Sequence, residues 1–318
     1  MALDYNELLS TTLSIYRKTL EDNIMSANPL FYWLSAKGRK KELSGGNKIV
    51  VPLRYGLNET VKSYEGYDTL DVTPQTGISA AEFNWKQIAG SVSISGAEER
   101  KNAGESKIID LLRAKIEQCE DSMIENLDEM AFGDGTGNDS KNILGLKAIV
   151  AVAPTTGTLG GINRADYSWW RNQYDATGYS AWGGASDTAI AAMREMYNKA
   201  SKGNIHPDLI LTTRSIFGKY EGACALNERF TSTAVADAGF ENLKFKGAVI
   251  MFDEYCTTAY MYFLNSRYLN WTVHSACDFL NTPFIRPENY DARVSQVLVM
   301  GNLVVSNCKQ QGILSALT

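Results

Sequence analysis

The stretch Gly45–Gly137 decides the fold of this chain, and it reads GGNKIVVPLRYGLNETVKSYEGYDTLDVTPQTGISAAEFNWKQIAGSVSISGAEERKNAGESKIIDLLRAKIEQCEDSMIENLDEMAFGDGTG. Its apolar patterns predict a strand at Lys48–Leu53 and a second strand at Ala81–Ile94. From Arg54 to Ser79 the alternation is weak, which predicts an extended loop or a loosely paired ribbon. A two-stranded arm cannot bury its own faces. We therefore expect it to need a neighbouring chain, as in an assembly subunit.

The second strand carries a change in its pattern. Apolar residues occupy one face before Gly90 and the other face after it, and we expect a bulge or a change of environment there. A long amphipathic helix follows, at about Ser106–Ala131, with a length of about 39 Å. Asn102 and Glu105 resemble a capping box at its start. Its apolar residues recur at three- and four-residue steps along one face: Ile108, Leu112, Ile116, Cys119, Met123, Leu127 and Met130.

The glycine-rich segment Gly133–Gly137 closes this helix. A phosphate-binding loop would instead open a helix and carry a Lys-Ser or Lys-Thr pair. An EF-hand would place a glutamate at its twelfth position, which is Gly145 here. We interpret the segment as a helix-terminating turn.

The rest of the chain mixes helices and strands without a βαβ repeat, which predicts the α+β class. An apolar stripe between Leu9 and Ile24 predicts a helix, and Leu30–Leu34 is a dense apolar anchor. The basic residues of Lys37–Lys41 predict an exposed loop, either a solvated turn or a contact with nucleic acid or an acidic partner. Further predictions are a strand and turn at Ile143–Val152, helices at Ser186–Ser201 and Ser215–Leu226, strands at Leu209–Thr212, Phe245–Phe252 and Ala259–Leu264, and a strand pair at Arg293–Val305 broken at Gly301-Asn302. The cap of the helix at Ser186–Ser201 is either Asp187 or Ser186.

Composition excludes several function classes. The chain has 318 residues, 44% hydrophobic and 21% charged, with a net charge of −5. An acidic balance disfavours sequence-specific nucleic-acid binding, which needs a basic face. The N-terminus resembles no secretory signal, and no apolar run is long enough to span a bilayer. Five widely spaced cysteines contain no CxxC pair, which favours free thiols in a reducing compartment and no metal site or cofactor.

Candidate catalytic groups are scarce. His206 and His274 belong to no metal-ligand spacing. Adjacent acids such as Asp253-Glu254 rarely converge on one substrate atom, which disfavours a glycosidase pair. Aromatic residues between Tyr167 and Trp182, including Trp169, Trp170 and Arg171, could stack on sugars or bases. Such residues are also typical of protein interfaces, so we expect packing in the domain or against a neighbour. The sequence predicts no enzyme.

The order of these segments resembles the major capsid proteins of tailed bacteriophages with the Hong Kong 97-type fold. The resemblance spans almost the whole chain and rests on local phrases: GGNKIVVPLRY, Trp85-Lys86-Gln87, Ser93-Ile94-Ser95-Gly96, the GDGTG helix end, Asn142-Ile143-Leu144-Gly145-Leu146, Pro207-Asp208-Leu209-Ile210, Phe245-Lys246-Gly247 and Val299-Met300-Gly301-Asn302-Leu303. It implies an N-terminal arm at 1–46, an extended two-stranded loop at 47–95, a peripheral domain with a spine helix at 96–152, an axial domain at 153–268 and the rest of the peripheral domain at 269–318.

The resemblance also implies partners and contacts. It implies a homo-oligomer of pentameric and hexameric capsomers in a virion capsid, assembled in the host cytoplasm around double-stranded DNA without membrane contact. Scaffolding, portal and decoration proteins would join it; the long scaffolding extension of the type member is missing, which implies a separate scaffold or a processed chain. The expected loop contacts are Tyr55, Tyr64, Tyr67, Asp68 and Leu70, and the expected axial contacts are Trp169, Trp170 and Arg171. The alternatives are a cargo-enclosing bacterial shell of the same fold, or a carbohydrate-binding module or enzyme that uses the aromatic residues.

Overall fold

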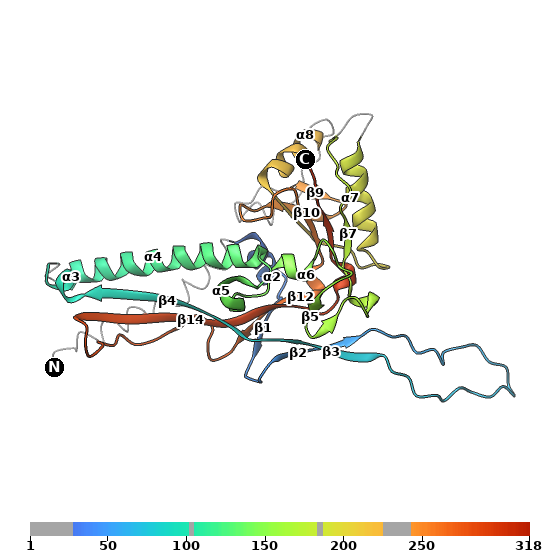
Figure 1. Ribbon diagram of the computed structural model, residues 1–318, viewed down its shortest axis with the longest axis horizontal. Coiled ribbons are helices and arrows are strands. Elements are labelled where there is room, and N and C mark those ends of the chain that lie inside the picture. The colour runs from blue at the N-terminus through green and yellow to red at the C-terminus, as the bar shows by residue number, and fades with distance from the viewer. Residues whose placement is uncertain (1–27, 102–104, 183–186, 225–242) are drawn as a thin grey trace.

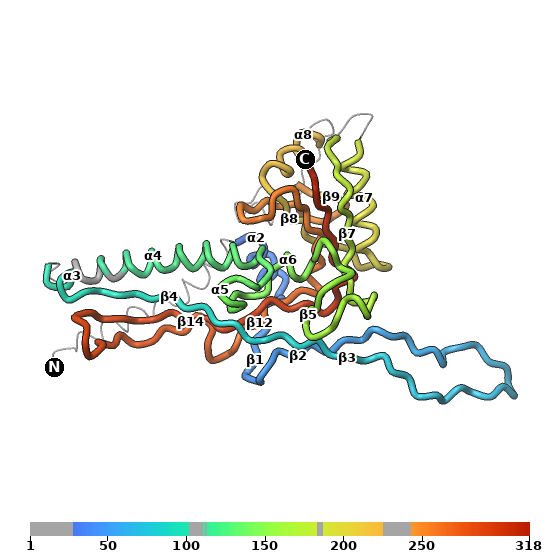
Figure 2. The backbone as a smooth tube through the Cα atoms, in the orientation of Figure 1, coloured from blue at the N-terminus to red at the C-terminus, as the bar shows by residue number. Residues whose placement is uncertain are grey.

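The computed structural model describes residues 28–101, 105–182, 187–224 and 243–318, so the helix predicted near Leu9–Ile24 and the cap predicted at Asn102 lie outside them. Figure 1 shows a long flat bar, an upright unit at one end of it, and a two-stranded loop that projects away from the bar. Figure 2 traces this loop as one out-and-back excursion of the backbone. Helices and sheets both contribute, which confirms the α+β class.

The bar consists of helix α4 (Glu105–Phe132) on a five-stranded sheet. Strand β14 (Ala292–Val305) is the axis of this sheet and runs unbroken through the predicted break at Gly301-Asn302. It pairs antiparallel with β4 (Lys86–Ser95) over its first ten residues. The other strands of this sheet are β12 (Leu269–His274), β13 (Leu280–Asn281) and β1 (Lys40–Leu43), which pairs parallel with β12.

Helix α4 lies along β4 through the apolar face that the sequence predicts. Ile116, Met123 and Leu127 are buried in this contact. The short helix α3 (Gly96–Lys101) joins β4 to α4. It starts with a reciprocal capping box, in which Ser95 Oγ accepts the Glu98 amide at 3.2 Å and Glu98 Oε2 accepts the Ser95 amide at 3.0 Å. The S-x-x-E pattern was thus present seven residues before the predicted Asn102–Glu105 cap.

The predicted strand at Ala81–Ile94 is two strands. Strand β3 (Ile78–Phe83) ends before Asn84-Trp85, and β4 begins after it. Odd-numbered residues such as Phe83 are buried in β3, whereas even-numbered residues such as Val92 are buried in β4. The face therefore switches at Asn84-Trp85. The bulge expected at Gly90 is wrong, because Gly90 pairs in register with Val297; its environment does change, since Cys119 and Met123 of α4 leave no room for a side chain there.

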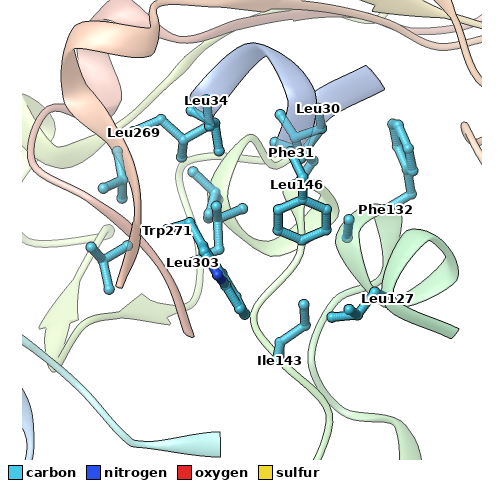
Figure 3. Close-up of a cluster of buried hydrophobic side chains, with 14 of the residues drawn as sticks. Leu30, Phe31, Leu34, Leu127, Phe132, Ile143, Leu146, Leu269, Trp271 and Leu303 are labelled. Carbon is cyan, nitrogen blue, oxygen red and sulfur yellow. The ribbon is translucent and has the colours of Figure 1, made fainter. Parts of the chain in front are cut away.

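The apolar anchor predicted at Leu30–Leu34 is helix α2 (Pro29–Ala36). Its side chains pack between the sheet and the end of α4, as Figure 3 shows. The rings of Phe31 and Trp271 meet edge to face at 5.1 Å. The predicted exposed turn is present at Lys37-Gly38, but the basic residues Lys40 and Lys41 begin β1, and Lys40 forms an ion pair with Asp278.

After α4 the chain turns sharply. The glycine-rich segment is the predicted turn: Asp134 Oδ1 accepts hydrogen bonds from the amide and the hydroxyl of Thr136. The short element α5 (Gly137–Ser140) contains left-handed residues, and the Lys86 ammonium donates to its Ser140 carbonyl. The strand predicted at Ile143–Val152 is wrong, because α6 (Leu146–Ile149) occupies it.

The upright unit has a six-stranded sheet in the order β7–β15–β11–β8–β10–β9. Strands β8 and β10 pair in parallel, and helix α8 lies in the sequence that connects them. The side chain of Asp187 caps α7, as predicted. The elements are β7 (Gln173–Asp175), β8 (Leu209–Thr212), β9 (Leu243–Phe245), β10 (Ala248–Phe252), β11 (Met261–Leu264), β15 (Gly312–Leu314), α7 (Thr188–Lys199) and α8 (Arg214–Cys224).

The predicted boundaries also differ at a hairpin of the upright unit and near the end of the sequence. The predicted strand Phe245–Phe252 is a hairpin of β9 and β10, which turns at the positive-φ pair Lys246-Gly247. Strand β15 lies in the upright sheet, although 269–318 was assigned to the peripheral part. The remaining short elements are β5 (Thr158–Leu159), β6 (Ile162–Asn163) and the 3-10 turns Ser168–Trp170, Ser266–Tyr268 and Cys308–Gln310.

Candidate intersubunit surfaces and an acidic joint

The projecting loop begins as a regular hairpin and then loses its pairing. Strand β2 (Ile49–Arg54) pairs with β3 from Ile49–Phe83 to Arg54–Ile78. The last cross-strand bonds run from the Tyr55 and Gly56 amides to the Gly77 carbonyl, at 3.0 and 3.3 Å. Residues 57–77 contain no strand. Local turns shape this part of the loop instead: Asn58 accepts from Thr60, and Asp71 accepts from Thr73.

The far part of the loop exposes apolar side chains. Tyr67 is 107% exposed, Tyr64 66% and Leu70 58%. Asp68 lies among them and closes a tight turn, in which its carboxylate accepts the Glu65 amide at 2.9 Å. Other exposed apolar residues of the loop are Leu57, Val61, Val72 and Ile78. A single chain gains nothing by presenting such a surface to water, and patches of this kind mark interaction sites.

The base of the loop rests on the aromatic segment that the sequence singled out. The rings of Tyr55 and Trp169 stack with centroids 4.6 Å apart and planes 10° apart. Tyr167 flanks the same indole at 5.7 Å. Beside this stack lies a hollow of about 420 Å³, with the cationic side chains of Arg54, Lys199, Lys202 and Lys309 among its lining residues.

The other predicted axial residues serve their own chain. Trp170 is 1% exposed, and its Nε1 donates to the Leu159 carbonyl at 2.9 Å, so it lies in the core and offers no surface to a neighbour. Arg171 donates to the carbonyls of Arg164 and Ala165 and braces the loop that contains them. The segment Trp169–Arg171 therefore lies at the base of the projecting loop.

The aromatic residues between Tyr167 and Trp182 do not form one cluster. Trp169 and Trp170 belong to the main core, whereas Tyr179 and Trp182 pack on the core of the upright unit. Trp182 Nε1 donates to the Thr318 carbonyl at 3.2 Å. Both histidines have structural contacts: His206 stacks on Tyr197, and His274 meets Trp85 edge to face.

An unpredicted feature lies where α4 meets the upright unit. The carboxyl group of Asp128, on α4, lies beside that of Asp253, which follows β10 and is 4% exposed. Burial raises the pKa of Asp128 to about 8, and the charge of Asp253 adds to the rise. Burial also raises the pKa of Asp253 to about 6, although hydrogen bonds from the Tyr255 amide and from Asp128 oppose this rise. The adjacent-acid reasoning missed this pair because its members are distant in sequence.

The described residues contain no group of three or more His, Cys, Asp or Glu side chains placed to hold a metal ion. All five cysteines carry free thiols. Within the same residues, no helix combines the length and the apolar character that a membrane span needs.

Known proteins resemble this chain in structure and not in sequence. No protein-family model and no curated protein matches the chain. Among solved structures, the cyanophage A-1(L) capsid asymmetric unit matches with a TM-score of 0.64 at 17% identity, over 88% of this chain and 90% of that one. The chain has the Hong Kong 97-type capsid fold. In this fold α4 takes the place of the spine helix.

Two further solved structures widen the comparison. The capsid of an empty GTA particle matches with a TM-score of 0.57 at 14% identity, over 88% of this chain and 94% of that one. The holo-SrpI encapsulin complex from Synechococcus elongatus matches with a TM-score of 0.58 at 10% identity, over 90% and 87%. Identities this low establish the Hong Kong 97-type fold and leave the contents of the shell open.

Proposed function

We propose that this chain is the major capsid protein of a tailed bacteriophage. It assembles into pentameric and hexameric capsomers and then into an icosahedral shell around a double-stranded DNA genome. The observation that carries the proposal is the projecting loop, whose apolar residues are left exposed by the part of the chain that the structure describes. A neighbouring copy supplies that cover.

The parts then have mechanical roles. The loop, with Tyr64, Tyr67, Asp68 and Leu70, lies over the adjacent subunit and straps it in place. Tyr55 and Trp169 fix the direction in which the loop leaves its own subunit. The helix α4 is a rigid lever about 42 Å long. Small rotations of this helix let identical subunits fit the unequal positions of an icosahedral shell. Segments 1–46, 47–95, 96–152, 153–268 and 269–318 correspond to the arm, loop, peripheral, axial and second peripheral parts, with β15 returning to the axial sheet.

The charge of the chain fits a container for DNA. A net charge of −5 keeps the inner surface from adhering to the packaged phosphates. The proposed partners are further copies of this chain, a scaffolding protein, a portal protein and decoration proteins. The protein works in the virion capsid after assembly in the host cytoplasm, without catalysis, cofactor, membrane or sequence-specific DNA contact.

Electron microscopy and sedimentation of the purified protein test the proposal directly. Rings, sheets or shells are the expected outcome. A monomer that remains monomeric at high concentration, with its loop intact, would count against a shell protein.

The second candidate is a cargo-enclosing shell of the same fold. Its support is the encapsulin match, whose TM-score of 0.58 is close to the cyanophage value of 0.64. The contents of isolated particles separate the two: nuclease-protected DNA indicates a capsid, and a co-purifying enclosed protein indicates a cargo shell. A sugar-binding module or enzyme has no such support, because the aromatic residues are divided between two cores.

A further inference from the structure

The joint between α4 and the upright unit brings two carboxyl groups together, each with one buried oxygen. Asp128 projects from the last third of α4, and Asp253 lies in the turn between β10 and β11. Asp128 Oδ1 and Asp253 Oδ2 are both buried, and no N–H or O–H of another described residue donates to either of them. Two carboxylates cannot approach in this way while both are ionised, because their charges repel at short range with little water to screen them.

Among the residues that the structure describes, no cationic side chain acts on the charge of either carboxyl group. The groups that act on Asp128, Asp253 or their neighbour Tyr255 are the acids Glu125, Glu129 and Glu254, all exposed. The thiol of Cys256 lies beside Asp253, and burial raises its pKa, so it stays neutral. Arg214 lines the same hollow of about 360 Å³ as Asp253, but its guanidinium lies over the ring of Phe252, 5.3 Å from the centroid.

We propose that Asp128 and Asp253 share one proton and form a proton-dependent latch between the spine helix and the upright unit. Asp128 carries the proton and donates to Asp253, whose other oxygen accepts the Tyr255 amide at 2.9 Å. Asp253 also lines the hollow, which brings solvent to one side of the buried pair, so the proton can leave as pH rises. Loss of the proton puts two negative charges into a buried contact and pushes the two parts of the subunit apart.

The sign of the pH effect follows from the raised pKa values of both carboxyl groups. An unfolded aspartate titrates near pH 3.9, so between this value and the folded values the native chain binds more protons than the unfolded chain. Stability therefore falls as pH rises through this range. The two carboxyl groups share their proton in mild acid, and they lose it and repel each other in mild alkali. This holds for the folded chain whether or not it encloses DNA.

Substitution by asparagine separates the latch from an ordinary buried contact. In Asp128→Asn the amide donates to Asp253 without a titratable proton, so the pair stays bonded at every pH. We expect the apparent melting temperature of unassembled wild-type chain near pH 8.5 to lie about 3–6 °C below that of Asp128→Asn. Near pH 5.5 the gap should be clearly smaller, because less of the range between the unfolded and folded pKa values of Asp128 has been crossed. Asp121→Asn, on the exposed side of the same helix, serves as the matched control and should follow the wild type at both pH values.

Hydrogen exchange gives a second readout at the same site. Wild-type amides in the β10–β11 turn should exchange faster near pH 8.5, after correction for intrinsic rates, whereas those of Asp128→Asn should not. Melting curves of the wild type and Asp128→Asn that stay parallel across the pH range would overturn the proposal. Stabilisation of the wild type near pH 8.5 by excess calcium, reversed by a chelator and absent in Asp128→Asn, would also overturn it, because the pair would then hold a cation instead of a shared proton.

Discussion

The ring of Tyr55 lies flat on the indole of Trp169, 4.6 Å away and tilted by 10°, and this stack joins the base of the projecting loop to the body of the subunit. Tyr55 stands at the last cross-strand hydrogen bond of the hairpin, to the Gly77 carbonyl. Beyond it the loop has no strand pairing. The stack therefore fixes the direction in which the unpaired part of the loop starts.

A double-mutant cycle on this stack should give a coupling free energy of about 0.5–1.5 kcal/mol, the range for aromatic pairs. The cycle compares Tyr55→Ala, Trp169→Ala and the double variant by urea denaturation of unassembled protein. Tyr290, which is exposed near the far end of the bar, supplies the control, and Tyr55→Ala with Tyr290→Ala should be additive. Additivity for Tyr55 and Trp169 as well would show that the stack contributes nothing.

Removal of residues 58–76 should abolish assembly and leave the subunit folded. The deletion joins Leu57 to Gly77, so that Gly56 and Leu57 form a two-residue turn between positions that are already hydrogen-bonded. Circular dichroism and denaturation report the fold, and sedimentation reports assembly. The matched variant replaces the same residues with a Gly/Ser linker of equal length. If the shortened protein still forms shells, the loop is not the strap.

Tyr67→Ser and Leu70→Ser should weaken assembly without destabilising the isolated subunit. Both side chains are exposed in the single chain, so nothing is lost there on folding. Full burial of each against a neighbour contributes about 1.5–3 kcal/mol, so each change should raise the critical concentration for assembly at least about tenfold. Light scattering across a concentration series measures this. Thr69→Ala, between them, should assemble like the wild type; an equal loss in all three variants would point to loop conformation instead.

Gly145→Ala should destabilise the subunit by about 3 kcal/mol or more. A Cβ at this position would lie 2.4 Å from the carbonyl oxygens of both Met130 and Gly133, at the end of α4. Backbone atoms held by a helix end cannot move aside. Gly218→Ala, inside α8 and with open space around it, should instead stabilise by about 0.5–1 kcal/mol. Chemical denaturation of both variants compares them, and equal effects of the same sign would contradict the steric argument.

Much of the architecture could be predicted from local patterns. The spacing of Ile116, Met123 and Leu127 determined both the length of the spine helix and the face that it buries. The weak alternation between Arg54 and Ser79 indicated the projecting loop. The Gly133–Gly137 turn and the Asp187 cap were also correct, because each depends on residues within one or two turns of the chain.

Some elements were misread because distant partners override local preference. Asn302 resembled a strand break, yet its side chain is buried and hydrogen-bonds to the Leu144 amide and the Asn84 carbonyl from within a continuous strand. Strand β1 runs through residues with a basic, loop-like pattern because β12 lies parallel to it. Gly90 marked a change of environment and not a bulge, since α4 passes too close there for a side chain.

By itself, the sequence determined a long helix, an arm that cannot bury its own faces and a chain without recognisable catalytic motifs. These are local properties, because periodicity and composition act over a few turns of backbone. Only the tertiary structure decided that Trp170 is core while Trp169 supports the loop, and that Asp128 meets Asp253. The physical reason is that contacts between distant segments depend on how helices and sheets pack, and no pattern within one segment records which partner it will meet.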